Sequence, residues 1–332
     1  MTFKTVTLIS ALMMSTAATA GELTIYTSYE EDEAAAFLDL AREAMPDVEM
    51  NMLRLSQGDL VARIIAEQGN PQHDVLWGFA ASAIVNPQIE KTLEPYAPDG
   101  VKQIPAQFRS PEDKWFAVSG YMAAFCVNNE RLKDKGLEMP TSWADLTDPA
   151  FKGEVVMPNP ASSGTGYIQI SSLLQMMGEE DGWAFLDKLD KNVAQYIKSG
   201  SKPCHAASAG EYVVGASYDM RAIKNINEGY PITMVIPSEG SGNELEANAL
   251  VASSDNKEDA KRFLDWTVTP EAATAYGKWK AIVTMPGGEK PQEFLDAGLP
   301  QDTSDVLHPT DFAAAAEDRT AIISEWEKRY ER

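Results

Sequence analysis

The sequence predicts an α/β protein in which two α/β lobes surround a ligand cleft and are joined by hinge strands. Stretches typical of strands and helices alternate from residue 22 to residue 77, as in an open, mostly parallel sheet. Two extended stretches, 115–119 and 121–128, are separated by Gly120 and are predicted to cross between lobes. A polar turn over 238–242 could lead the chain back, so the second lobe would be inserted within the first.

The first twenty residues have the features of a signal peptide. Lys4 supplies a positive charge, residues 6–14 form a short apolar stretch, and Ala18-Thr19-Ala20 fits a cleavage site. We therefore expect an exported protein that is located in the periplasm, with a cell-surface space as the alternative. The predicted lobes are 21–118 plus 238–285 for lobe 1, and 119–237 plus 286–332 for lobe 2.

The elements of the first lobe follow from residue alternation and from residues that stop helices. Residues 22–27 alternate and include β-branched side chains, which predicts a strand. The helix after loop 28–31 ends near Pro46, because proline does not continue a helix. The alternation then continues with a strand at 48–53, a helix at 60–68 that is ended by Gly69-Asn70-Pro71, and a strand at 74–77.

The rest of the chain contains the same mixture of elements. Thr141 or Ser142 can cap a helix that begins in 140–146. The spacing of apolar residues predicts further helices at 168–177, 181–189, 208–212, 257–266, 271–279 and 313–330. The strands expected here are 153–157, 193–197, 215–219, 232–237 and 248–253.

The turn before the predicted helix 168–177 is a candidate binding site. It is rich in hydroxyl groups and glycine, and the N–H groups and dipole of a helix start favour an anion, phosphate-like groups above all. The alternative is that Ser162 or Ser163 only caps the helix. The residues expected to bind the anion are Ser162, Ser163, Gly164 and Thr165.

Side chains near the carboxyl ends of other strands are further candidates, because ligands bind beyond these ends in open sheets. Glu30 and Asp219 could pair with a cationic group. Alternatively, either carboxylate could only stabilise the N-terminus of the helix that follows it. Aromatic side chains could form walls or donate phenol hydrogens, and each of them could instead be structural. These aromatic candidates are Tyr29, Trp77, Tyr121 and Tyr212.

Cys126 and Cys204 are the two cysteines of the sequence. An isolated pair in an oxidising compartment usually forms a disulfide. Closing so long a loop would stabilise the protein by about 4 kcal/mol. Two buried free thiols are the alternative, because a sequence does not show whether the two Cα atoms lie within bridging distance.

Charge and motif content argue against a nucleic-acid-binding protein and against an enzyme. A net charge of −22 would be repelled by the phosphates of nucleic acid. The sequence contains no nucleotide-binding glycine loop, no H-E-x-x-H and no G-x-S-x-G, and its three histidines stand in no motif. We therefore expect no enzyme, no cofactor and no metal site, with a secreted hydrolase as the alternative from another class.

Several short segments carry a family resemblance. They are 23–27 at the start of the mature chain, Asp74-Val75-Leu76-Trp77, Trp143-Ala144-Asp145-Leu146, Pro149-Ala150-Phe151-Lys152-Gly153, Gly210-Glu211 and 260–266. Together they resemble bacterial extracellular solute-binding proteins of ABC importers. The resemblance covers the mature chain and implies a type II periplasmic-binding fold, a monomer, and delivery of a small solute to an inner-membrane ABC permease.

Two branches of that family are nearest in sequence, the ferric-iron binders and the 2-aminoethylphosphonate binders. Ferric binders carry two adjacent tyrosines in the region that reads Gly215-Ala216-Ser217-Tyr218-Asp219 here, which has no tyrosine pair, and Glu30 stands where they often have a histidine. The segments 159–167 and 210–217 resemble the aminoethylphosphonate branch instead. The resemblance thus implies 2-aminoethylphosphonate, with ferric iron, thiamine, a polyamine or a sugar phosphate as alternatives.

The site predicted in this way has two ends, which suits a zwitterion. The phosphonate would bind at Ser162–Thr165, where hydroxyl and N–H donors could suffice without any arginine. The ammonium would bind at Glu30, at Asp219 or on aromatic faces. We expect both lobes to contact the ligand and to close on it by a shift of an existing equilibrium.

Overall fold

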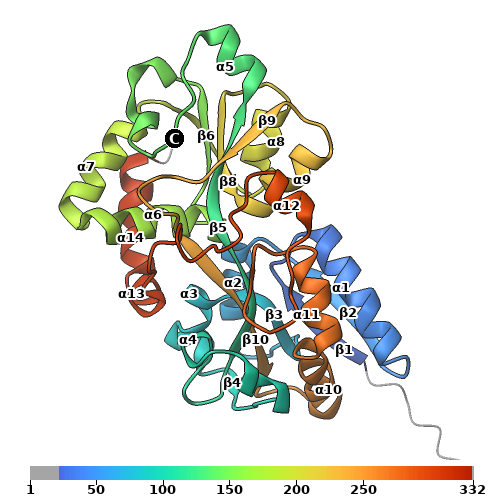
Figure 1. Cartoon of the computed structure of the whole chain (residues 1–332). Helices are drawn as coiled ribbons and strands as arrows, with labels where there is room; N and C mark the ends of the chain where they lie inside the picture. Colours follow the sequence, from blue (N-terminus) through green and yellow to red (C-terminus); the bar gives the residue numbers. More distant parts are fainter. Residues whose placement is uncertain (1–21, 331–332) are drawn as a thin grey trace, which may run out of the picture.

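The structure is a computed structural model that describes residues 22–330, so the predicted signal peptide lies outside the described residues. Two lobes lie one above the other in Figure 1. A mixed sheet runs through both of them, with the strand order β2-β1-β3-β10-β5-β8-β6-β7. Strand β4 also pairs with β10, and β9 and β11 also pair with β5.

The lower lobe is built on parallel strands that are connected by helices. Its first elements are β1 (Glu22–Thr27), α1 (Glu31–Ala44), β2 (Glu49–Arg54), α2 (Gln57–Ala66) and β3 (Val75–Ala80). Strand β1 lies between β2 and β3 and pairs with both in parallel. Successive residues of a strand face opposite sides. Trp77 and Leu76 accordingly belong to separate apolar cores on the two faces of the sheet.

Strands β5 (Phe116–Asn128) and β10 (Asn243–Val251) connect the lobes. Their antiparallel pairing runs from Met122 opposite Asn243 to Phe116 opposite Asn248. The second half of β5 pairs with β8 of the upper lobe, so β5 contributes to the part of the sheet in each lobe. The extended stretches predicted on either side of Gly120 are present, but they form one continuous strand in which Gly120 is an interior residue. A Cβ there would lie 2.6 Å from the carbonyl oxygen of Glu244, so glycine allows the two strands to pair closely.

The upper lobe contains two further apolar cores. Buried side chains between its sheet and helices include Phe125, Trp143, Leu173 and Trp326. The strands are β6 (Val155–Pro158), β7 (Val193–Ile197), β8 (Val214–Tyr218) and β9 (Ile232–Val235). The helices are α5 (Asn129–Lys135), α6 (Gly164–Met177), α7 (Glu179–Leu189), α8 (Lys202–Ser208) and α9 (Asp219–Asn227).

The remaining elements are short or lie towards the C-terminus. Those before β5 and in the loops are α3 (Ala81–Ile84), α4 (Pro87–Glu90), β4 (Leu93–Glu94) and the 3-10 turns Asp99–Gln103, Ala106–Phe108, Asp145–Thr147 and Pro149–Phe151. Those after β10 are α10 (Lys257–Thr267), α11 (Pro270–Gly277), β11 (Ile282–Val283), α12 (Gln292–Asp296), α13 (Phe312–Glu317) and α14 (Arg319–Tyr330). The lobe boundaries given above stay a prediction.

Several expected elements differ from those observed. The sheet is not mostly parallel, since β10 pairs antiparallel with both β3 and β5. Residues 208–212 do not begin a helix, because α8 ends at Ser208 and Gly210 adopts a φ of +80°. The expected helix in 140–146 is replaced by a 3-10 turn over Asp145–Thr147. The C-terminal helix is divided at Asp318, and α13 packs against α3 whereas α14 packs against α6.

Cys126 and Cys204 form a disulfide with their Cα atoms 5.2 Å apart. The bond joins β5 to α8 within the upper lobe. Among residues 22–330, no helix combines the length and the apolar character that crossing a membrane requires.

Candidate ligand-binding site

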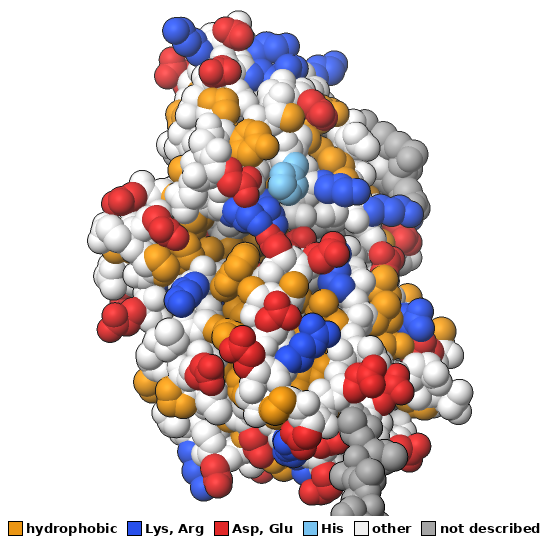
Figure 2. Space-filling view, turned by 90° about the vertical axis from the view of Figure 1, so that its right-hand side faces the viewer, with side chains coloured by type: hydrophobic (Ala, Val, Ile, Leu, Met, Phe, Trp, Pro, Cys, Tyr) orange, Lys and Arg blue, Asp and Glu red, His pale blue; other side chains and the backbone are white. Residues whose placement is uncertain are grey.

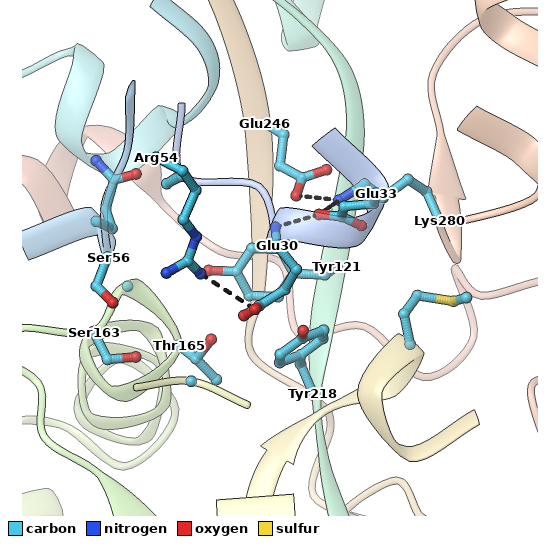
Figure 3. Close-up of a pocket in the computed structure, with 15 residues that line it drawn as sticks. Glu30, Glu33, Arg54, Ser56, Tyr121, Ser163, Thr165, Tyr218, Glu246 and Lys280 are labelled. Carbon is cyan, nitrogen blue, oxygen red and sulfur yellow. Dashed lines mark hydrogen bonds and ion pairs between the residues drawn. The ribbon is translucent and has the colours of Figure 1, made fainter. Parts of the chain in front are cut away.

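A cleft between the lobes encloses about 550 Å³ of empty space, part of it open to solvent. The starts of α1, α2 and α6 and the ends of β2 and β8 converge on it, and β5 and β10 form its rear wall. Figure 3 shows the side chains that line it. They are Ser28, Glu30, Glu33, Arg54, Ser56, Gln57, Tyr121, Ser163, Gly164, Thr165, Gly200, Tyr218, Met220, Glu246 and Lys280.

One end of the cleft is the N-terminus of α6. The Ser163 hydroxyl caps the helix by accepting a hydrogen bond of 3.2 Å from the N–H of Gly166. Within the described residues, the N–H groups of Gly164 and Thr165 have no acceptor. These donors stand at the positive end of a helix of 14 residues, which favours an anion there. A Cβ at Gly200 would lie 2.4 Å from the Thr165 hydroxyl oxygen, so the close packing beside this hydroxyl requires glycine.

A second helix N-terminus, that of α2, faces the same end. Ser56 is its N-cap residue and makes no side-chain hydrogen bond to the helix. The N–H of Gly58 donates to the carbonyl oxygen of Ser162 at 3.1 Å, which joins α2 of the lower lobe to the turn before α6. A Cβ at Gly58 would lie 2.1 Å from the carbonyl oxygen of Ala161, so only glycine allows this approach. Two positive helix ends therefore meet at one place.

Arg54 adds a positive side chain to this end of the cleft. It stands at the last position of β2, its Nε donates to the carbonyl oxygen of Tyr29 at 2.8 Å, and its Nη2 lies 3.3 Å from Glu30 Oε2. The carbonyl contact orients the guanidinium, which is the group best suited to bind a phosphate through two parallel hydrogen bonds. Arg54 was not among the residues proposed from the sequence, where hydroxyl and N–H donors could suffice without an arginine.

The other end of the cleft holds a buried ion cluster, which we call the Lys280 cluster (Glu33, Glu246 and Lys280). Lys280 Nζ lies 2.8 Å from Glu33 Oε1 and 2.7 Å from Glu246 Oε1. Burial lowers the pKa of Lys280, but the two carboxylates outweigh this effect and raise its pKa above the ordinary value. Burial raises the pKa of Glu33, although Lys280 opposes that shift. In Figure 3 the cluster and the side chains of Ser56, Ser163 and Thr165 lie on opposite sides of Glu30.

Tyr121 of β5 and Tyr218 of β8 lie between the two ends, with ring centroids 5.6 Å apart. Burial, together with Glu244 and Glu246, raises the pKa of Tyr121 well above its usual value. Burial and Glu30 do the same for the pKa of Tyr218. Both phenols therefore remain protonated at neutral pH and can donate hydrogen bonds to a solute.

A second hollow of about 860 Å³ adjoins the cleft between α1 and α9. It shares Glu30, Glu33, Tyr218 and Met220 with the cleft. An ion pair between Lys224 and Asp32 spans it and links the two lobes. Figure 2 shows acidic and basic side chains side by side along the lobe boundary on this face. The cleft thus continues towards a polar surface.

The structure brings together one group of the residues proposed from the sequence. Those that line the cleft are Glu30, Tyr121, Ser163, Gly164 and Thr165. The others lie outside its lining: Tyr29, Trp77, Ser162, Tyr212 and Asp219. Of these, Trp77 is wholly buried in the lower core, and Tyr29 is 1% exposed with its hydroxyl 3.1 Å from Ser119 Oγ.

The contacts of Ser162, Tyr212 and Asp219 indicate what these residues do instead. Ser162 contributes its carbonyl to the bond with Gly58, and Tyr212 is half-buried in the loop after α8. Asp219 accepts hydrogen bonds from the N–H groups of Met122 and Met220, and burial raises its pKa to about 7. This carboxylate therefore fixes the start of α9 against β5.

Sequence reasoning missed most of the charged lining. Arg54 follows the second strand directly, so the rule about carboxyl ends of strands could have identified it. Tyr218 also ends a strand and stands next to Asp219, which was proposed from the sequence as a binding residue. Lys280 and Glu246 carried no such signal, because their meeting with Glu33 depends on packing between segments far apart in the sequence. Across residues 22–330, no group of three or more His, Cys, Asp or Glu side chains is arranged to hold a metal ion.

Residues 70–299 match the family of bacterial extracellular solute-binding proteins. An uncharacterized protein of Haemophilus influenzae is 33% identical over 84% of this chain and 82% of its own length. The probable ABC transporter periplasmic-binding protein y4fP of Sinorhizobium fredii is 27% identical over 81% of this chain and 76% of its own.

Solved structures agree with that assignment. The periplasmic binding protein AfuA from Actinobacillus pleuropneumoniae, solved with fructose-6-phosphate bound, has a TM-score of 0.84 at 30% identity and covers 94% of this chain and 99% of its own. Apo ferric ion-binding protein A of Pasteurella haemolytica has a TM-score of 0.77 at 17% identity, over 93% of this chain and 98% of its own, which shows a common fold alone.

The chain is thus a solute-binding protein with the mixed α/β fold of the periplasmic binding proteins, and it belongs to the bacterial extracellular solute-binding family. The family is one of solute-binding proteins and not of enzymes. The predictions of the fold and of a non-enzymatic solute-binding protein are confirmed.

Proposed function

We propose that this protein is the periplasmic binding subunit of an ABC importer for a small organic phosphate or phosphonate. The observation that carries the proposal is the convergence of two helix N-termini, Arg54 and the Thr165 hydroxyl at one end of the cleft. Free N–H groups, a guanidinium and hydroxyls are the donors that bind phosphate oxygens in proteins. AfuA, which is similar over most of the chain, was solved with fructose-6-phosphate.

Two solutes within this class are favoured by separate observations. A sugar phosphate is favoured by the similarity to AfuA. The zwitterion 2-aminoethylphosphonate is favoured by the surplus of carboxylates over cations in the lining, where Glu30, Glu33 and Glu246 face only Arg54 and Lys280. An ammonium group would offset that surplus, whereas sugar hydroxyls would bind to it by hydrogen bonds alone.

The mechanism follows from the contacts that cross the cleft. The phosphate or phosphonate binds to α6 of the upper lobe and to Arg54 of the lower lobe, so a bound solute joins the lobes. The bond from Gly58 to Ser162 and the ion pair between Lys224 and Asp32 form only when the lobes are close together. The solute shifts the protein towards this closed form. The closed protein, a monomer, then delivers the solute to an inner-membrane permease.

Isothermal titration of the mature protein, residues 21–332, tests the proposal. The probes are glucose 6-phosphate, fructose 6-phosphate, 2-aminoethylphosphonate, inorganic phosphate, spermidine, thiamine and ferric citrate. We expect micromolar or tighter binding of at least one organic phosphate or phosphonate, and no comparable binding of spermidine, thiamine or iron. Heat from spermidine, thiamine or iron alone would overturn the proposal and identify the solute class directly.

A further inference from the structure

The Lys280 cluster has no donor left for a solute. Lys280 is 4% exposed, and its ammonium group has three hydrogens. Two are directed to Glu33 Oε1 and Glu246 Oε1, and Nζ also lies over the Tyr29 ring, 4.2 Å from its centroid. Lys280 therefore fixes the two carboxylates and does not bind an anion itself.

The carboxylates of the same cluster keep acceptor capacity. Glu33 Oε1 also accepts the N–H of Glu30 at 2.9 Å, but within residues 22–330 Glu33 Oε2 accepts no hydrogen bond. Glu246 Oε2 accepts the Ser119 hydroxyl at 2.6 Å, and each carboxylate oxygen has two lone pairs. Both residues line the cleft. When ionised they carry two negative charges against the single positive charge of Lys280.

Resting on the function proposed above, we propose that the Lys280 cluster selects the end of the solute remote from the phosphate. An acceptor-only surface of net negative charge binds hydroxyl or ammonium donors there and rejects a second anionic group. The substrate class is therefore a singly phosphorylated or phosphonylated compound that carries hydroxyl or amine donors. Bisphosphates and phosphorylated carboxylic acids are excluded, although the α6 end would accept their phosphate.

Matched ligands separate this inference from the proposed function. In titrations of residues 21–332, 2-aminoethylphosphonate is compared with ethylphosphonate and phosphonoacetate, and glucose 6-phosphate with fructose 1,6-bisphosphate. We expect the better donor-bearing ligand to bind at least about tenfold more tightly than ethylphosphonate, as one hydrogen bond to a charged group implies. Phosphonoacetate and fructose 1,6-bisphosphate, which carry a second anionic group, should bind more weakly still.

The outcomes distinguish the two claims. If ethylphosphonate, phosphonoacetate and the donor-bearing ligands bind equally well, the selection by the Lys280 cluster is wrong while the proposed function stands. If no phosphate or phosphonate binds, the proposed function is wrong and the inference falls with it. The comparison of 2-aminoethylphosphonate with glucose 6-phosphate shows which donor, ammonium or hydroxyl, the cluster prefers.

Variants locate the selectivity at the cluster. Glu246→Gln and Glu33→Gln keep the shape of each side chain and remove one negative charge. In whichever variant retains a folded far-ultraviolet circular dichroism spectrum, the preference for a donor-bearing ligand over ethylphosphonate should fall to about threefold or less, because one charged acceptor is lost. Glu94→Gln, at the ion pair with Lys257 outside the cleft, is the matched control and should keep the preference. An unchanged preference in a folded cluster variant contradicts the inference.

Discussion

Single side chains in the cleft are held by protein contacts that leave one group of each available to a solute. Arg54 uses Nε on the carbonyl of Tyr29 and pairs Nη2 with Glu30, which leaves Nη1 for a solute. Ser163 caps α6 through Gly166 and leaves the N–H groups of Gly164 and Thr165 for a solute. Contacts of this kind orient the binding groups before the solute arrives, so less conformational entropy is lost on binding.

Thr165→Ala tests the anion end. We expect the phosphorylated or phosphonylated ligand that binds best to lose about 1.5–3 kcal/mol of binding free energy, the range for a hydrogen bond to a charged group. Isothermal titration measures the loss. Thr274→Ala removes an exposed hydroxyl that bonds only to Pro270 of its own helix, and it should leave the affinity unchanged. Equal affinities of wild type and Thr165→Ala would remove this hydroxyl from the site.

His73 gives a prediction about stability and pH. Its ring is stacked on Tyr26 at 4.4 Å, neither ring nitrogen has a hydrogen-bond partner, and burial lowers its pKa to about 4. Below the unfolded pKa of about 6.5, the unfolded chain binds a proton that the native state does not, so stability falls as pH decreases from about 6.5 to 4. The loss from this residue is about 2 kcal/mol at pH 5.

His73→Phe should therefore raise the free energy of unfolding at pH 5 relative to wild type, and by less at pH 7.5. Denaturant unfolding at several pH values gives the difference. A difference between variant and wild type that does not grow on acidification would show that His73 is not the group that titrates.

At the scale of elements, local sequence patterns predicted most helices and strands but few of the contacts between them. The turn before α6 was recognisable because hydroxyl residues and glycines follow a short apolar run. The shared strand β5 was predicted as two stretches, since glycine usually interrupts a strand. Gly120 is present within the strand because β10 approaches it closely. The Lys280 cluster could not be predicted from local patterns, because its three residues are separated by up to 247 positions.

Gly58→Ala tests the contact between α2 and the turn before α6. The added Cβ would lie 2.1 Å from the carbonyl oxygen of Ala161 and 2.7 Å from Cα of Ser162, and backbone atoms cannot move aside easily. Because the two segments belong to different lobes, the clash opposes closure. An overpacking cost of about 1–3 kcal/mol should then appear as weaker binding of every phosphorylated ligand.

Titration of Gly58→Ala, together with its thermal unfolding, checks this expectation. Gly69→Ala is the matched control, since a Cβ at Gly69 meets no atom within 4 Å. We expect the control to bind as wild type does. Wild-type affinity in Gly58→Ala would mean that the bond to Ser162 is not needed for closure.

For the whole molecule, the Cys126–Cys204 disulfide closes a loop with a sequence separation of 78 residues. The double variant Cys126→Ala, Cys204→Ala should lose about 4 kcal/mol of stability, because the unfolded chain regains conformational entropy. Denaturant unfolding measures this loss. The affinity for solute should not change, since neither cysteine lines the cleft. A stability equal to that of the wild type under oxidising conditions would contradict the assigned bond.

Strand β5 has a consequence for how the chain folds. Its first half completes the sheet of one lobe and its second half that of the other, and β10 pairs with β3 across more than half of the chain. Neither lobe can therefore finish its sheet until distant parts of the chain have met, which slows folding. Excising 129–235 would remove β8 and β9 and leave the second half of β5 without these two partners. Despite its separate cores, the protein should melt in one cooperative calorimetric transition, and two resolved transitions would show that the lobes fold independently.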